Sequence, residues 1–577
     1  MAKEMNGNGH DKRAAFSADL KAHVNGHVNS DDHWERASGF AGIFILKTLR
    51  DRGYKVVLYE AGDGLGGTWR WNRYPGAGVD SQVPVYEFSW PEVWKTWNWT
   101  TSHPGQQELT AYFDHVDQVF DISKDCRFNT VVTGAEFDVD SGRWMVSTQN
   151  GHEARAKYFI PAVGFSAKRF VPDWPGISDF KGVMHHSSFW PENDVVVEGK
   201  RCAIIGTGSS GVQLVEAWGP RAGSLVVLQR TPNMALPMRR WALTTEEQEA
   251  RKVFYPELFR YREQTSIGLH FDWDERLTLS ATPKERRRVY EEAWAAGGFH
   301  FWAGLFKDNL VSAEANAESY RFWAEKVRER VRDPATRALL APAEMPHFFG
   351  AKRPSVEEEY YEQFNRPSVR LVNVRENPIR RLTETGIELH DGTHLEVDVI
   401  AMATGFDTVT GGMTTLNPTS IHKTRLADDW AGGVDTYLGL TVSGYPNMFS
   451  LYGAHAPTLL ANGPSCAEIQ GRWVADMVDK LEVRGAKYVD ASREASRRWK
   501  AEVKRLNDGM LFPRTRHSNY MGGNAPGKME EPMCFTGGLP AYTRVIRQAL
   551  DTMDGFDVVY EQARSEQSGL EIPRLSV

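Results

Sequence analysis

The sequence contains few cysteines, and none of them is placed for metal binding or redox chemistry. The four residues Cys126, Cys202, Cys466 and Cys534 are scattered and form no C-x-x-C or C-x4-C pair. The sequence therefore has no signature of a zinc site or of a dithiol redox centre. The spacing favours free thiols in a reducing compartment. We therefore predict no bound metal.

Long apolar runs and a strong net charge are also missing. No stretch approaches the roughly 18 consecutive apolar residues of a membrane span, and the N-terminus lacks the apolar core of a signal peptide. A formal net charge of -7 creates no field that would attract nucleic acid. We therefore expect a cytoplasmic protein, monomeric or weakly oligomeric, with neither nucleic acid nor a membrane as a partner.

The chain is long enough for more than one core. Its 577 residues predict two or three domains. Residues 1–32 are polar and rich in Gly, Asn and His, which predicts a disordered tail. The 19 Trp residues exceed what such cores need, and they favour a large apolar or aromatic ligand.

Two strand-and-helix units can be recognised. A helical pattern over 39–53 and a strand over 54–62 form most of a first βαβ unit, and a second unit spans 200–232. Residues 240–345 are charged and helical in pattern, and strand character returns over 369–406. The sequence thus predicts an α/β fold with two Rossmann-like dinucleotide-binding domains and a helical insertion.

The second unit carries a complete G-x-G-x-x-G turn between a strand and a helix. Its glycines allow a tight turn and the close approach of a pyrophosphate, whose charge meets the helix N-terminus. The next strand ends in Arg230 and Thr231 where an NAD site carries an acid, and a guanidinium favours the additional 2'-phosphate of NADPH. The residues of this predicted NADPH turn are Gly206, Thr207, Gly208, Ser209, Ser210 and Gly211.

The first unit has the opposite charge at the equivalent position. Glu60 closes its strand, and a carboxylate there suits an unphosphorylated ribose such as that of FAD. Gly39 and Gly42 are present in its turn, but Ala37 takes the place of the first glycine. The preceding residues 31–36, DDHWER, are too charged for a strand buried on both faces. Either the first strand is absent, or it is built from other residues, or flavin binding is compromised.

These sites define the expected domain boundaries. The predicted FAD-binding domain has two parts, 33–165 and 386–577, and the second part includes a control loop. The predicted NADP-binding domain covers 166–385, with the helical insertion at 240–345.

Residues 180–191, FKGVMHHSSFWP, have the pattern of neither an ordinary strand nor an ordinary helix. They match F-x-G-x-x-x-H-x-x-x-W-P, the fingerprint of the Baeyer-Villiger flavin monooxygenases, at Phe180, Gly182, His186, Trp190 and Pro191. The sequence resembles this family from residue 39 to its end. The resemblance implies that the stretch is an interdomain linker which couples the nicotinamide position to flavin chemistry.

A second family pattern, [AG]-G-x-W-x4-[FY]-P-[GM]-x3-D, is matched over 66–80. The resemblance implies that Gly78, Val79 and Asp80 meet the nicotinamide beside the flavin. It places further cofactor contacts at Gly67, Thr68, Trp69, Trp71 and Tyr86.

The resemblance also implies a reaction. NADPH and O2 are used with FAD to insert an oxygen atom next to a ketone carbonyl, which gives an ester or a lactone. Arg353 matches the family's catalytic arginine, whose permanent charge stabilises negative charge on oxygen, and Asp80 matches the acid that orients it. Lys352 resembles a second ligand of the 2'-phosphate.

The substrate is weakly encoded. Loop 451–465 resembles loops of relatives that act on large cyclic or polycyclic ketones, and Asn519 stands where most relatives have a Trp that helps close the control loop over NADP. The helical insertion borders the pocket in the family, but aromatic residues in such a segment more often form core. The residues in question are Trp294, Phe299, Phe301 and Trp302.

Two other functions fit parts of the pattern. A heteroatom-hydroxylating flavin monooxygenase shares both nucleotide folds, but it lacks the Trp-Pro ending and needs no arginine for attack on a carbonyl. A non-catalytic, flavin-deficient relative would follow if the altered first turn no longer binds FAD.

Overall fold

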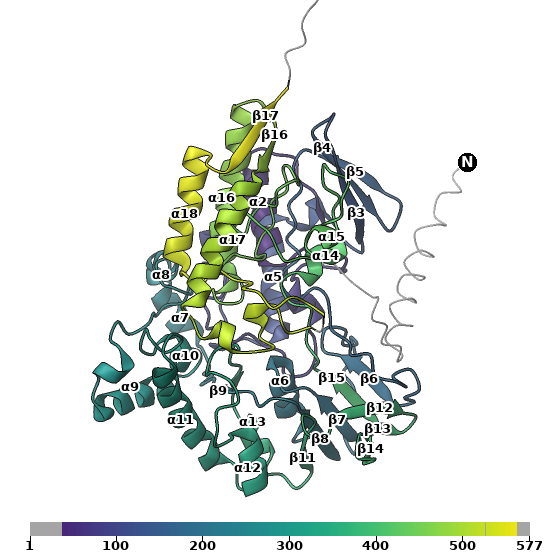
Figure 1. Cartoon of the computed structure of the whole chain (residues 1–577), viewed down its shortest axis with the longest axis vertical. Helices are drawn as coiled ribbons and strands as arrows, with labels where there is room; N and C mark the ends of the chain where they lie inside the picture. Colours follow the sequence, from purple (N-terminus) through teal and green to yellow (C-terminus); the bar gives the residue numbers. More distant parts are fainter. Residues whose placement is uncertain (1–36, 526, 562–577) are drawn as a thin grey trace, which may run out of the picture.

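The computed structural model describes residues 37–525 and 527–561 (Figure 1). The predicted tail over 1–32 and the charged segment 31–36 lie outside these residues. Within the described part of the chain, no helix combines the length and the apolar character that crossing a bilayer requires.

A five-stranded parallel sheet forms the core of the second unit, in the lower part of Figure 1. Its strand order is β11-β8-β7-β15-β6. The central strands are almost continuously buried, as expected for a parallel sheet covered on both faces. The strand bounds are β6 (Val183–His186), β7 (Arg201–Ile205), β8 (Ser224–Gln229), β11 (Val369–Asn373) and β15 (Val399–Met402).

Two features of this sheet differ from the sequence interpretation. The linker fingerprint includes a true strand, because β6 pairs in parallel with β15 at the sheet edge. The sheet also extends past the expected boundary at 385, because β15 lies between β6 and β7. Directly before β15 in the chain is a small antiparallel sheet of three strands, β12 (Ile379–Thr383), β13 (Gly386–Leu389) and β14 (His394–Glu396). We therefore place the end of this unit after β15.

The first unit is built from segments distant in sequence. Helix α2 (Phe40–Asp51) packs beside α16 (Gly463–Val483), so the C-terminal part of the chain completes the unit that the N-terminal part begins (Figure 1). The strand predicted over 54–62 is shorter in the structure: β1 covers Leu58–Tyr59 and pairs in parallel with β2 (Cys126–Arg127). An antiparallel sheet follows, with β3 (Val132–Asp138), β4 (Arg143–Thr148) and β5 (Glu153–Ala156).

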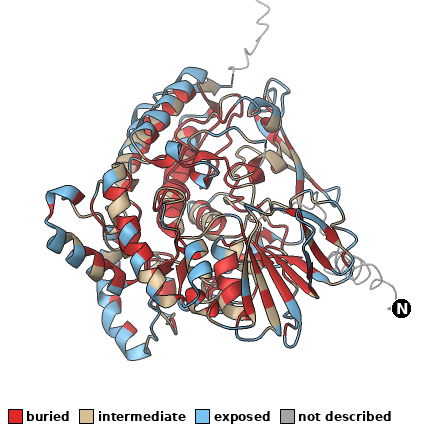
Figure 2. Ribbon diagram, turned by 60° about the horizontal axis from the view of Figure 1, so that its bottom comes forward, coloured by how far each residue is buried: buried red, intermediate tan, exposed pale blue. Residues whose placement is uncertain are grey.

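The segment 240–345 is helical, as the sequence predicts. Helices α7 and α9 each begin with a capping box, Thr244 with Glu247 and Thr282 with Glu285. Figure 2 shows buried faces turned inward and exposed faces outward on the peripheral helices. The helices are α7 (Thr245–Arg251), α8 (Tyr255–Arg262), α9 (Pro283–Ala296), α10 (His300–Ala303), α11 (Ala313–Arg330) and α12 (Pro334–Leu340).

The remaining elements complete the two units. The helices are α3 (Thr68–Trp71), α4 (Pro91–Trp94), α5 (Gln106–Phe120), α6 (Ser209–Trp218), α13 (Tyr360–Gln363), α14 (Gly411–Leu416), α15 (Leu426–Asp429), α17 (Arg493–Asp508) and α18 (Leu539–Thr552). The strands are β9 (Leu236–Pro237), β10 (Val356–Glu357), β16 (Ala486–Ala491) and β17 (Phe556–Tyr560).

Candidate active site

The two glycine turns have the same construction. A Cβ atom on Gly211 would lie 2.1 Å from the carbonyl oxygen of Gly206, and a Cβ atom on Gly42 would lie 1.7 Å from that of Ala37. Only glycine fits at either position. Ala37 therefore occupies the place that Gly206 holds in the second turn, so the altered first turn keeps its close helix packing.

Glu60 lies at the end of β1, where the sequence predicts a ribose-binding acid. Its side chain is fully buried and accepts hydrogen bonds from Ser38 N (2.8 Å), Gly62 N (2.7 Å) and Trp71 Nε1 (3.2 Å). Burial raises the pKa of Glu60 and the three donors counteract the rise. The sequence interpretation missed Ser38, which joins this acid directly to the turn.

These residues fit FAD. A Cβ atom on Gly67, which has a φ of +52°, would lie 2.7 Å from Gly39 Cα, so the two backbones touch beside the start of α2. The first turns of α2 and α6 contain no acidic residue, so nothing opposes a pyrophosphate at either helix N-terminus. When bound, FAD takes electrons from NADPH and uses them to activate O2.

The second turn is held by hydroxyl groups. Thr207 Oγ1 donates to the carbonyl of Thr231 at 3.0 Å, and the hydroxyls of Ser209 and Ser355 lie 3.1 Å apart. Asn233 Nδ2 donates to Thr207 O at 2.9 Å. Gly208 is the N-cap residue of α6 and has open space beside it. The Ser210 side chain lies near the Tyr74 hydroxyl.

Three cations lie within electrostatic range of one another near the carboxyl ends of β8 and β11. Arg230 follows β8, and Lys352 lies near enough for the charges of Arg230 and Arg375 to act on it. The sequence interpretation missed Arg375. Its position just after β11, the neighbour of β8, could have indicated it, because ligands bind beyond the carboxyl ends of parallel strands. The cluster suits an added phosphate.

Lys352 makes this cluster sensitive to pH. Burial, together with Arg230 and Arg375, lowers the pKa of Lys352 to about 8. A lowered pKa means that the ammonium form, which attracts a phosphate, is lost as the pH rises through this value. We expect the Kd of NADPH to increase by up to about tenfold per pH unit above it, whereas the Kd of NADH stays flat. Binding titrations would show this, and Lys352→Arg should remove the dependence. A flat NADPH profile for the unmodified chain would contradict it.

The fingerprint residues connect the two units. His186 Nε2 lies 3.1 Å from the carbonyl of Gly405, and its Nδ1 lies 2.8 Å from the Ser188 hydroxyl. Trp190 is buried against Trp218 of α6, with ring centroids 5.7 Å apart. Phe180 is buried in a hydrophobic cluster with residues of the parallel sheet. Gly182 packs closely against the chain, because a Cβ atom there would lie 2.4 Å from Asp398 O. Pro191 lines a cleft.

Arg353 and Asp80 are brought together although 273 positions separate them. Arg353 Nη2 lies 3.0 Å from Asp80 Oδ2, and its Nη1 donates to the carbonyl of Leu459 at 2.8 Å. Their side chains are 26% and 33% exposed, so both face an open space. Burial lowers the pKa of Arg353, but Asp80, together with Tyr520 and Tyr452, more than offsets this and holds the pKa above its ordinary value.

Aromatic rings complete the surroundings of this cation. The guanidinium carbon of Arg353 lies 4.5 Å from the ring centroid of Phe299 and 5.5 Å from that of Trp302. Both side chains are nearly fully buried, so they are core residues that also face Arg353. Trp294 and Phe301 pack against each other at 5.3 Å.

The segment that carries Asp80 is fastened to the second unit. Tyr74 donates to Gln213 Oε1 at 2.6 Å, and Gln213 Nε2 donates to the carbonyl of Gly78 at 3.0 Å. Val79 is buried beside them. Gln213 belongs to α6, which begins at the second glycine turn, so this helix contacts the backbone two residues before Asp80.

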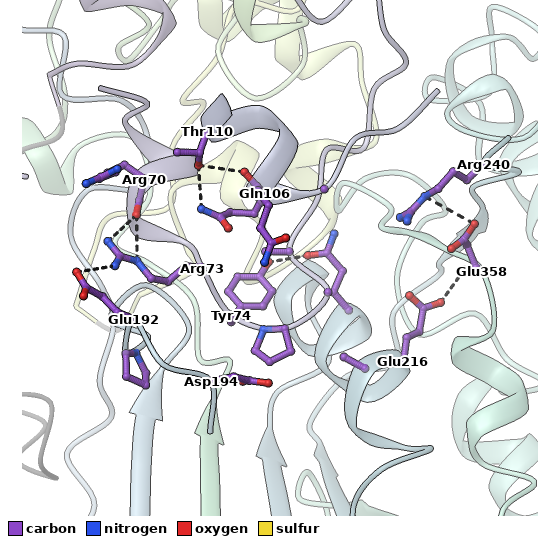
Figure 3. Close-up of a pocket in the computed structure, with 18 residues that line it drawn as sticks. Arg70, Arg73, Tyr74, Gln106, Thr110, Glu192, Asp194, Glu216, Arg240 and Glu358 are labelled. Carbon is purple, nitrogen blue, oxygen red and sulfur yellow. Dashed lines mark hydrogen bonds and ion pairs between the residues drawn. The ribbon is translucent and has the colours of Figure 1, made fainter. Parts of the chain in front are cut away.

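A cleft of about 770 Å³ lies behind this connection. Residues of both units line it (Figure 3): Arg70, Arg73 and Gln106 on one wall, Glu216, Arg240 and Glu358 on the other. Arg73 pairs with Glu192 at 3.4 Å, on the same side of the cleft (Figure 3). The connection through Tyr74 and Gln213 therefore joins the two units at the edge of an open cleft.

A hydrogen-bonded aromatic pair lies within electrostatic range of Asp80 and Arg353. Trp69 Nε1 donates to the Tyr86 hydroxyl at 3.1 Å. Burial raises the pKa of Tyr86, and the charges of Asp80 and Arg353 also act on it. Thr68 begins the short helix α3 that carries Trp69. The predicted flavin contacts thus adjoin the pair formed by Arg353 and Asp80.

Comparison with known proteins identifies relatives of this chain in sequence and in structure. Residues 36–233 match the family model described as flavin-binding monooxygenase-like. The chain is 52% identical over 522 residues to the FAD-binding monooxygenase acrE of Aspergillus aculeatus, covering 90% of this chain and 88% of that one. It is 41% identical over 505 residues to cyclopentanone 1,2-monooxygenase of Comamonas sp., covering 88% and 92%. A solved structure of oxidized steroid monooxygenase bound to NADP has a TM-score of 0.86 and 35% identity, covering 91% and 98%.

The fold and the site define a flavoprotein monooxygenase with separate sites for two dinucleotides. The chain belongs to the Baeyer-Villiger flavin monooxygenases. It is an oxidoreductase whose cofactors are FAD and NADPH. The family, fold class, enzyme class and cofactors predicted from the sequence are thereby confirmed.

Proposed function

We propose that the chain inserts an oxygen atom next to the carbonyl of a large cyclic or polycyclic ketone, with Arg353 as the catalytic cation and Asp80 as the residue that orients it. The observation that carries this proposal is the Arg353–Asp80 pair, which lies beside the predicted flavin contacts Trp69 and Tyr86. The site assignments made from the sequence, and the two domains with their boundary placed after β15, are part of the same proposal.

Arg353 is suited to stabilise negative charge that develops on oxygen during attack on a carbonyl. Its charge does not titrate in the accessible pH range. Its three hydrogen bonds, two to Asp80 and one to Leu459 O, fix the guanidinium before substrate arrives. A preorganised donor of this kind is worth about 3 to 4 kcal/mol to the transition state. A heteroatom hydroxylation creates no such oxyanion and would not need this residue.

A large apolar substrate is supported by the residues around this cation. Phe299 and Trp302 present aromatic faces to Arg353, and Leu459 belongs to the loop 451–465 that resembles loops of relatives acting on large ketones. One structural neighbour is a steroid monooxygenase, at 35% identity. A polycyclic ketone would bury more apolar area in the open space that Arg353 and Asp80 face than cyclopentanone would.

A substrate panel tests the proposal. The FAD-loaded protein would be supplied with NADPH and with cyclopentanone, a bicyclic ketone, a steroid ketone or a thioether, and the products identified by mass spectrometry. We expect esters or lactones, with kcat/KM increasing with ring number, and little sulfoxide. Conversion of cyclopentanone alone would contradict the substrate class, and sulfoxide as the main product would favour the heteroatom-hydroxylating alternative.

A further inference from the structure

A fully buried arginine lies behind the aromatic pair of the flavin site. Arg262 ends α8 in the helical insertion, and its side chain has 0% exposure. Its Nη1 donates to the carbonyls of Val85 (2.7 Å) and Glu87 (2.9 Å), and its Nη2 lies 3.1 Å from Glu468 Oε2 of α16. A buried charge is costly unless it is paired, and here two other segments supply the partners: residues 85–87 bind Nη1 and α16 pairs with Nη2.

The two carbonyls belong to the residues on either side of Tyr86. The Tyr86 hydroxyl accepts the hydrogen bond from Trp69 Nε1, and its ring packs edge-on against Phe40 at 5.1 Å. Because one guanidinium nitrogen binds the carbonyls of Val85 and Glu87, the residues before and after Tyr86 are both held by the same side chain.

Other contacts hold the same segment. Asn462 Nδ2 donates to the carbonyl of Val85 at 3.0 Å. The carboxylate of Glu468 accepts from the backbone N of Ser89 (2.8 Å) and from its hydroxyl (2.7 Å). Residues 85–89 are therefore fixed by α8 from the helical insertion and by α16 from the C-terminal part, with Arg262 joining all three.

We propose that Arg262 is a positioning residue, which fixes Tyr86, and through it Trp69, against the flavin. This inference rests on the proposed function, since it assumes that Tyr86 and Trp69 face FAD. It adds a physical link between the helical insertion, which carries Phe299 and Trp302, and the wall of the flavin site. Arg262 touches no predicted substrate or cofactor position itself.

Arg262→Lys is the first test. An ammonium can keep the ion pair with Glu468 but lacks the planar fork that binds the carboxylate and two carbonyls together. We expect the FAD Kd, measured by titrating apoprotein, to rise about tenfold, and the absorbance spectrum of bound FAD and the share of NADPH that yields hydrogen peroxide to change. Arg472→Met is the matched control: Arg472 pairs with Glu468 at 3.5 Å and with Glu263 at 2.5 Å, and it makes no hydrogen bond to the carbonyls at 85 and 87. It should leave the FAD Kd and spectrum unchanged.

A double-mutant cycle separates positioning from stability alone. In a Tyr86→Phe background, which loses the hydrogen bond from Trp69, the effects of Arg262→Lys on FAD Kd and peroxide yield should largely disappear, although the melting temperature falls in both backgrounds. Equal effects in both backgrounds would overturn the proposal. If Arg262→Lys does not fold, Arg262→Met/Glu468→Gln leaves no unpaired buried charge and carries the same expectation.

The cycle also distinguishes the two levels of the argument. If Tyr86→Phe changes the FAD Kd and spectrum but Arg262→Lys does not, the role of Arg262 is overturned and the flavin site stands. If Tyr86→Phe itself changes neither, Tyr86 does not face the flavin, and the site assignment falls together with this inference.

Discussion

Arg353→Ala is expected to keep consuming NADPH while ester formation falls about 10²- to 10³-fold, the cost typical of removing one preorganised donor to a developing oxyanion. The substitution removes the cation held by Asp80 and the bond to Leu459 O, but it leaves both glycine turns untouched. NADPH consumption, hydrogen peroxide and ester should be measured in the same reaction.

Arg353→Lys is the control for charge without geometry. A lysine at this position keeps a positive charge but cannot reproduce the fork that binds Asp80 and Leu459 O together. We expect an ester yield between those of the unmodified chain and the alanine variant. An unchanged yield for Arg353→Ala would refute the assigned role of Arg353.

Arg230→Ala is expected to weaken NADPH binding about 10- to 100-fold, the usual value of a charge-assisted hydrogen bond, and to leave NADH binding nearly unchanged. The residue lies at the end of β8 beside Lys352 and Arg375, where a 2'-phosphate would be held by three cations. The Kd of each nucleotide can be measured by titration.

The exposed Arg370 on β11 is a matched control, because it lies on the neighbouring strand and before the carboxyl end of the sheet. Arg370→Ala should change neither Kd. Equal losses of NADPH and NADH affinity in Arg230→Ala would show that Arg230 does not recognise the phosphate.

Local patterns predicted the parts of the site that short stretches of chain can build. The second glycine turn is a strand-to-helix corner whose close contacts lie within six residues, so Gly206 and Gly211 could be identified from spacing alone. The resemblance to a known family paired Arg353 with Asp80, and the structure brings these two side chains together.

Features that depend on long-range pairing could not be predicted in this way. The position of β15 between β6 and β7 depends on pairing among three segments that are far apart in the sequence. The expected boundary at 385 therefore separated β15 from the sheet to which it belongs. Arg262 is similar: in the sequence it resembles its neighbour Arg260, an exposed residue paired with Glu257 on its own helix. Only the fold shows that one of the two is buried.

The most direct test of the account is the origin of the oxygen in the product. The FAD-loaded protein would convert a polycyclic ketone with NADPH under isotopically labelled O2, and the mass of the ester would be determined. Insertion of one atom of O2 predicts one labelled oxygen atom in each ester molecule, at the position next to the former ketone carbonyl. An unchanged ketone with all consumed oxygen recovered as hydrogen peroxide would contradict it.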